Sequence, residues 1–229
     1  MSQAKLILSQ SPPPWVPLRF FVTAPLFALA GAILTLWFGA EMFVSRWSAP
    51  LLSLTHLVVM GFMAMVMTGA LIQVVSVLLG GEIPGIRNKS ALVHAGLSLG
   101  TISLAAGFIG GGPWFMRGAV LLLGVAFAMF AWIMLQALRS SSARSDSAIG
   151  IGLALIALLI TVVLGLWLAS GYAWEGITLA RAFSDTHLAW GLLGWVGILV
   201  ITVAYEVVPM FQLTPPYPAR LTSWLAPVQ

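Results

Sequence analysis

Six long apolar stretches dominate this sequence, and they restrict the fold more than any other feature. They lie near residues 20–44, 51–79, 90–110, 117–138, 148–170 and 186–211. A helix needs about 20 apolar residues to cross the hydrocarbon core of a bilayer. Only 7% of the residues are charged, whereas a soluble domain carries about 25%. We therefore predict an all-α, polytopic transmembrane bundle of about six helices, forming a single domain over residues 1–229.

The segments between these stretches are short and rich in turn-forming residues, as at residues 80–85 and 110–113. None of them is long enough to fold as a separate domain. Residues 1–14 contain one lysine and three adjacent prolines and have no long apolar run, which is unlike a cleavable signal peptide. We therefore expect the first helix to act as its own insertion signal.

The lysines and arginines predict how the chain is oriented in the membrane. Seven fall on the side of the N-terminus and three on the other side. The first group is Lys5, Arg19, Arg87, Lys89, Arg139, Arg144 and Arg220, and the second is Arg46, Arg117 and Arg181. Positive loops remain in the cytoplasm, so both termini are predicted to be cytoplasmic. The expected location is the bacterial cytoplasmic (inner) membrane, crossed several times.

Several classes of protein are excluded by what the sequence lacks. There is no cysteine, which excludes disulfides, thiolate metal sites and covalently attached haem. A phosphate-binding glycine loop, a Ser-His-Asp arrangement and an HExxH zinc motif are all missing. The basic residues are scattered singly rather than forming a stripe, so no nucleic-acid partner is expected.

The three histidines all lie within predicted spans, where polar groups are costly and usually have a role. His56 and His187 fall near the outer ends of the second and sixth spans, whereas His94 enters the third span from the cytoplasmic side. The first two have similar surroundings, Thr-His-Leu at residues 55–57 and again at 186–188. This similarity indicates a faint internal repeat between the second and sixth spans.

Two histidines at one depth are suited to bind haem iron or copper, for which imidazole is a common ligand. We predict that His56 and His187 bind haem b or, as the alternative metal, copper. Gly191 and Gly194 follow His187 on one helical face and leave a groove that a flat macrocycle or another helix can approach. The alternative is that both histidines only form hydrogen bonds between helices, which is the interpretation favoured for His94.

A methionine stripe follows the first of these histidines. Met60, Met63 and Met67 lie four, seven and eleven residues after His56, on one face of an α-helix. Thioethers bind Cu(I) and also serve as axial haem ligands. Methionine is also a common filler of helix cores, and that interpretation is favoured here.

Three other polar side chains are predicted within the membrane: Gln73, Tyr205 and Glu206. Glu206 is a carboxylate inside a predicted span, near the cytoplasmic end of the sixth. A carboxylate there is a candidate for proton entry or quinone contact. A capping or interface role near the end of the helix is the alternative.

Two stretches resemble a known family. They are Thr55-His56-Leu57 with Gly61-Phe62-Met63, Met67, Gly69-Ala70-Leu71 and Gln73, and His187-Leu188 with Gly194-Trp195-Val196-Gly197 and Tyr205-Glu206-Val207-Val208-Pro209-Met210. Both resemble helices of the NnrS-like proteins, relatives of the catalytic subunit of haem–copper oxidases. The resemblance implies a haem-binding membrane protein with metal sites toward the outer leaflet. By that resemblance His56 matches a low-spin haem ligand and His187 a copper ligand.

The resemblance also sets the functional expectations. It implies electron transfer linked to respiratory redox chemistry or to a nitric oxide response, with a quinone or cytochrome as redox partner. The later metal-ligand helices of the haem–copper fold have no counterpart here, so stand-alone reduction of oxygen or nitric oxide is not expected. A second subunit, a homodimer or a longer chain would each supply what is missing. The alternative functions are a membrane transporter or copper-handling protein, and a structural or assembly subunit of a larger membrane complex.

Overall fold

The computed structural model describes residues 11–80, 83–141, 146–178, 181–218 and 220–222. Regular structure in these ranges is entirely helical. Six helical stretches are long and apolar enough to cross a membrane, which confirms the predicted all-α transmembrane bundle. Lys5 and Arg144, used to predict orientation, lie outside the described residues, as do Gly81 and Glu82 of the predicted 80–85 turn.

Each membrane span consists of one to four helical segments. Span one is α1 (Trp15–Phe38) and η2 (Gly39–Phe43), and span two is α2 (Ala49–His56), η3 (Leu57–Ala64) and α3 (Met65–Leu79). Span three is α4 (Ile86–Ala106) and η4 (Gly107–Gly111), span four is α5 (Pro113–Ser140), and span five is α6 (Asp146–Ala173). Span six is η5 (Arg181–Phe183), α7 (Ser184–Ala189), η6 (Trp190–Gly197) and α8 (Ile198–Gln212). Segments η2 and η5 are 3₁₀-helical, whereas η3, η4 and η6 are π-helical.

The first span begins earlier than hydropathy suggested, at Trp15 rather than residue 20. Pro14 and Pro17 lie at the start of this helix. The first backbone N–H groups of a helix have no partner within it, so prolines are tolerated there. Span four likewise begins at Pro113, directly after Gly112, whose φ of 80° suits glycine.

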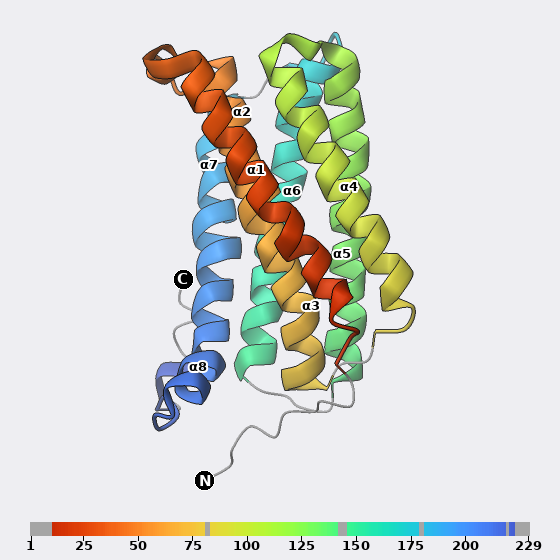
Figure 1. The fold of residues 1–229 in the computed structure, drawn as a ribbon, viewed down its shortest axis with the longest axis vertical. Coiled ribbons are helices and arrows are strands. Elements are labelled where there is room, and N and C mark those ends of the chain that lie inside the picture. Colours follow the sequence, from red (N-terminus) through yellow and green to blue (C-terminus); the bar gives the residue numbers. More distant parts are fainter. Residues whose placement is uncertain (1–10, 81–82, 142–145, 179–180, 219, 223–229) are drawn as a thin grey trace.

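Consecutive spans run in opposite directions through the bundle, and α1 crosses obliquely over its neighbours (Figure 1). We call the end where α1 begins the inner end and the opposite end the outer end. Span six packs mainly on α6, and α6 packs on α5. Spans two and six therefore lie on either side of the bundle interior rather than packing directly on each other.

The most extensive helix contact joins α4 and α5, and small residues lie within it. A Cβ added at Gly96 would come within 2.8 Å of the Ala126 Cβ, and one at Gly100 within 2.7 Å of the Leu123 Cγ. Lipid tails are as apolar as leucine, so membrane helices associate through close packing rather than through the hydrophobic effect. These glycines set how closely α4 and α5 approach.

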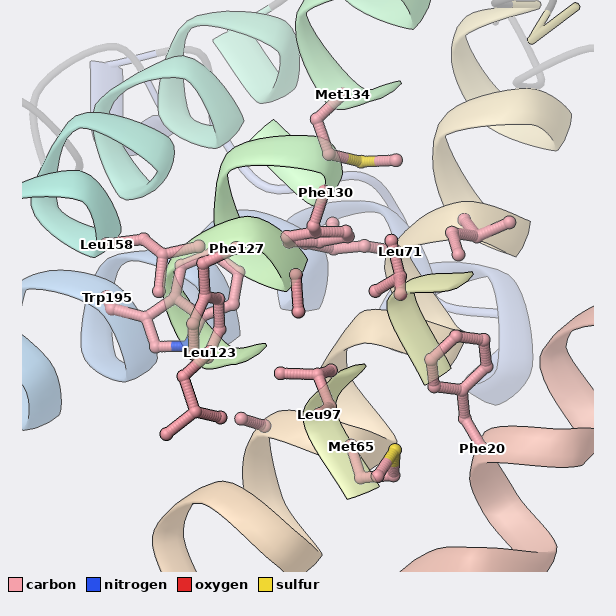
Figure 2. Packing of buried hydrophobic residues seen from close by; sticks show 14 of the residues in the cluster. Phe20, Met65, Leu71, Leu97, Leu123, Phe127, Phe130, Met134, Leu158 and Trp195 are labelled. Atoms are coloured by element: carbon pink, nitrogen blue, oxygen red, sulfur yellow. The ribbon is translucent and has the colours of Figure 1, made fainter. Parts of the chain in front are cut away.

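A continuous apolar core runs through the bundle. Figure 2 shows Phe127 and Phe130 of α5 beside Leu158 of α6 and Trp195 of η6, with Phe20 of α1 reaching in from the opposite side. Large apolar side chains also cover the outer surface of the helices, as expected for contact with lipid. Leu36, Trp37 and Trp114 are among the most exposed of these.

Two of the π-helical segments, η3 and η6, begin shortly after a histidine. Segment η3 begins directly after His56, and η6 begins three residues after His187. A π-helix forms i→i+5 hydrogen bonds and often occurs at functional sites. Its wider turn also changes which side chains share a face, so the α-helical spacing used on the sequence does not continue through these segments.

Candidate functional site

A cavity of about 540 Å³ lies in the outer half of the bundle, between spans two to six. Its wall is mainly apolar, with polar side chains gathered toward the outer end. The polar and aromatic lining residues are Arg46, Trp47, Thr55, His56, Phe108, Phe127, Thr161, Tyr172, Arg181, Ser184, Asp185, His187 and Trp195. A volume of this size is typical of sites for small molecules and cofactors.

His56 lies in the cavity wall at the C-terminal end of α2, half-buried. Its Nδ1 is 2.8 Å from the carbonyl oxygen of Leu52, one turn earlier in the same helix. The imidazole packs on the Phe108 ring, with centroids 5.3 Å apart, and Phe108 meets Tyr172 edge-on at 5.5 Å. The ring is therefore held by one hydrogen bond and by an aromatic row that reaches α6.

His187 lies in the wall of the same cavity, on α7. Its Nδ1 is 2.9 Å from the carbonyl oxygen of Thr161, on the neighbouring α6. The imidazole packs over Gly165, where an added Cβ would come within 2.8 Å of the His187 Cε1. A glycine at this position therefore gives the imidazole room against the α6 backbone.

The two histidines have the same hydrogen-bonding arrangement. In each ring Nδ1 bonds a backbone carbonyl, and no described residue forms a hydrogen bond with Nε2. A histidine that ligates a metal commonly donates its other N–H to a carbonyl or carboxylate, which fixes the tautomer and the ring orientation. Together with the π-helical segment after each histidine, this extends the resemblance between spans two and six from sequence to backbone.

Helix α6 approaches the two glycines that follow His187. A Cβ at Gly191 would come within 3.3 Å of the Thr161 Cγ2, and one at Gly194 within 2.9 Å of the Ala157 Cβ. Gly191 also borders the cavity, whereas Gly194 does not. Of the two occupants considered for this groove, a neighbouring helix is therefore the one in place.

One methionine of the predicted stripe borders the cavity. Met60 borders the cavity, but Met63 and Met67 are absent from its lining. Met67 is partly buried and packs against the core. Met60 and Met63 lie within the π-helical segment η3, and Met67 lies three residues after its end.

An ion pair and two cation–aromatic contacts form the outer mouth of the cavity. Arg46 pairs with Asp185, which joins the first outer loop to the start of span six. Both guanidinium groups lie over the Trp47 ring, that of Arg46 at 4.9 Å from the ring centroid and that of Arg181 at 5.3 Å. In the sequence both arginines indicate only the topology of the chain. The adjacent Arg46 and Trp47, in the turn before α2, are the local feature that indicates this mouth.

His94 lies away from the cavity, between α1 and α4. The hydroxyl of Thr23 is 2.8 Å from the His94 Nε2, and the ring meets Phe20 edge-on at 5.3 Å. This arrangement is a hydrogen-bonded helix contact, the interpretation favoured for His94. Thr101 lies seven residues after His94, on the same face of α4, and is fully buried.

The other predicted polar residues lie near the inner end. Gln73 donates from Nε2 to the Ser11 hydroxyl at 2.9 Å. Glu206 accepts a hydrogen bond of 2.8 Å from Ser147, which joins α8 to the first turn of α6. Tyr205 packs on Tyr217, with ring centroids 5.7 Å apart. None of the three predicted residues borders the cavity.

Comparisons of the chain with protein-family models, with curated proteins and with solved structures found no match.

Proposed function

We propose that this chain is a haem-binding membrane protein in which His56 and His187 ligate the iron of haem b. The observation that carries the proposal is that both imidazoles border one cavity, with Nδ1 on a backbone carbonyl and Nε2 without a partner among the described residues. Imidazole is the commonest protein ligand of haem iron, and helix bundles often hold haem between facing helices.

The remaining wall suits an apolar macrocycle with a polar edge. The inner part of the cavity is lined by leucine, valine, alanine and aromatic side chains, whereas Arg46, Arg181 and Asp185 lie at its mouth. Trp195 borders the cavity, and its Nε1 is buried without a hydrogen-bond partner among the described residues. When bound, haem supplies an iron that takes up and releases single electrons. The protein's part is to orient the two imidazoles and to exclude water.

The donor set favours haem over a bare metal ion. Haem takes one or two axial ligands from the protein, a number that two histidines can supply, whereas a closed metal site usually has at least three. Among the described residues no group of three or more His, Asp or Glu side chains is close enough to hold a metal ion. Copper handling through the methionine stripe has weaker support, because Met60 alone of the three borders the cavity.

An ultraviolet–visible spectrum of the detergent-purified chain, oxidised and then reduced with dithionite, tests the proposal. We expect a Soret band that shifts and sharpens on reduction in the native chain and is lost in His56→Ala and in His187→Ala. His94→Ala is the matched control, since that imidazole bonds Thr23 away from the cavity. It should retain the band.

A colourless native chain, purified intact from haem-replete cells, would contradict the proposal. The second candidate is then a structural or assembly subunit, which is favoured by the carbonyl partners that both cavity histidines already have. In that case His56→Ala and His187→Ala would lower the thermal stability of a haem-free protein about as much as His94→Ala does.

The proposed setting is electron transfer in the bacterial inner membrane, in respiratory redox chemistry or a nitric oxide response. The resemblance of the two histidine helices to NnrS-like proteins supports this setting. A quinone or a cytochrome is the proposed redox partner, and a second subunit or a homodimer is the proposed assembly. Contact with the lipid bilayer follows from the six apolar spans.

A further inference from the structure

A second hollow, of about 480 Å³, lies on the surface of α5 at the inner end of the bundle. It is lined by Trp132, Gln136, Arg139 and Ser140 of α5 and by Pro84, just before α4. The four α5 residues follow one another at the spacing of a single helical face. The hollow is shallow and open, and it is separate from the histidine cavity.

Two cations meet at this hollow. Arg139 is exposed and forms no ion pair with any described residue. The Nζ of Lys89 donates to the Oε1 of Gln136 at 2.9 Å, which places a second cation at its edge. No described lining residue is a carboxylate.

Several other arginines have a charged or aromatic partner, unlike Arg139. Arg46 pairs with Asp185. Arg19 and Arg87 both stack on Trp15, at 4.8 and 5.5 Å from its ring centroid. By contrast, the hollow combines a guanidinium that has no ion-pair partner in the described ranges with an indole, Trp132, that is 53% exposed.

We propose that this hollow binds the phosphate of an anionic phospholipid from the surrounding bilayer, with Arg139 and Lys89 contacting the headgroup. A guanidinium matches the geometry of phosphate oxygens. Tryptophan is enriched at the level of the headgroups, where its ring meets both apolar and polar surroundings. Basic pockets between transmembrane helices bind anionic headgroups in the same way. The site lies at the end of apolar, lipid-facing helices, so a lipid is the phosphate source at that depth.

The test measures lipid binding to the detergent-purified full chain by native mass spectrometry, with phosphatidylglycerol and phosphatidylcholine titrated separately. We expect phosphatidylglycerol to bind more tightly, and Arg139→Gln to weaken it by about fivefold, as one lost cation near a headgroup should. Lys89→Gln should act in the same direction. Binding of phosphatidylcholine should not change.

Arg87→Gln is the matched control, because it removes one charge at the same end from a side chain that stacks on Trp15. It should leave phosphatidylglycerol binding as in the native chain. Equal losses in Arg87→Gln and Arg139→Gln would overturn the proposal, since net charge alone would explain them. Equal affinity of the native chain for the two lipids would also overturn it. Release of the lipid by millimolar inorganic phosphate would assign the hollow to free phosphate instead.

Discussion

The two cavity histidines are held in different ways, although their hydrogen bonds look alike. The carbonyl partner of His56 belongs to its own helix, one turn away. The partner of His187 is Thr161, on a different span. The orientation of His56 is therefore a local property of α2. That of His187 depends on how α6 and α7 pack, so small changes on α6 should affect it selectively.

Gly165→Ala is such a change. Its Cβ would lie 2.8 Å from the His187 Cε1, well inside normal contact distance, so the imidazole must move off the Thr161 carbonyl. Overpacking of this kind costs about 1–3 kcal/mol. Each 1.4 kcal/mol of binding free energy that is lost weakens the affinity for haem about tenfold. The haem-to-protein ratio of the purified variant measures this.

Gly152→Ala controls for the substitution itself, because it adds a Cβ on the same helix where no atom lies within 4 Å. Alanine is favoured over glycine in a helix by roughly 0.5–1 kcal/mol. This variant should therefore retain its haem and unfold at the same or a slightly higher temperature. If both variants lost haem equally, His187 would not depend on the space at Gly165.

At the scale of elements, hydropathy predicted the six spans but not the faces that they present. Met60 and Met67 share a face on a regular α-helix, and both pack against the core, but only Met60 borders the cavity. The π-helical turns of η3 lie between them. No residue pattern in that apolar stretch distinguishes i→i+5 from i→i+4 bonding. The α-helical spacing assumed for the sequence is therefore not that of the two segments that follow the histidines, whereas α5 is α-helical from Pro113 to Ser140.

The contact between α4 and α5 makes a prediction of its own. Gly96→Leu would drive a side chain into the Ala126 Cβ and the Leu122 carbonyl, now 2.8 and 3.3 Å from an ideal Cβ. Neither atom is at the end of a flexible side chain, so the helices must separate. We expect a loss of about 1–3 kcal/mol in the free energy of unfolding, or more. Titration with a denaturing detergent, followed by circular dichroism, measures it.

Ala95→Leu introduces the same side chain at the preceding residue, which is exposed on the lipid-facing side of α4. Its effect should stay within about 0.5 kcal/mol, as for most surface substitutions. A similar loss in both variants would show that leucine is tolerated poorly anywhere on α4. The close approach at Gly96 would then have no special role.

For the whole molecule, the sequence located the candidate site but not its surroundings. The equal depth of His56 and His187 could be predicted because both open a span from the same side. Their shared cavity also depends on Phe108, Thr161 and Gly165, which come from other spans and carry no motif. The Arg46–Asp185 pair joins residues far apart in the sequence. Such contacts depend on packing between spans, which hydropathy does not specify.

Orientation is the property of the whole molecule on which the position of both sites in the membrane depends. Described cations are concentrated at the inner end, so that end is predicted to face the cytoplasm.

The chain has no cysteine, so one introduced thiol can be labelled without background. Ala40→Cys places an exposed thiol at the outer end, and Asn88→Cys places one at the inner end. A membrane-impermeant maleimide should label the first in intact spheroplasts and the second only after permeabilisation. The reverse pattern would turn the histidine cavity toward the cytoplasm and the Arg139 hollow away from it. Labelling of both thiols in intact spheroplasts would mean a mixed or dual orientation, which the seven-to-three distribution of basic residues does not predict.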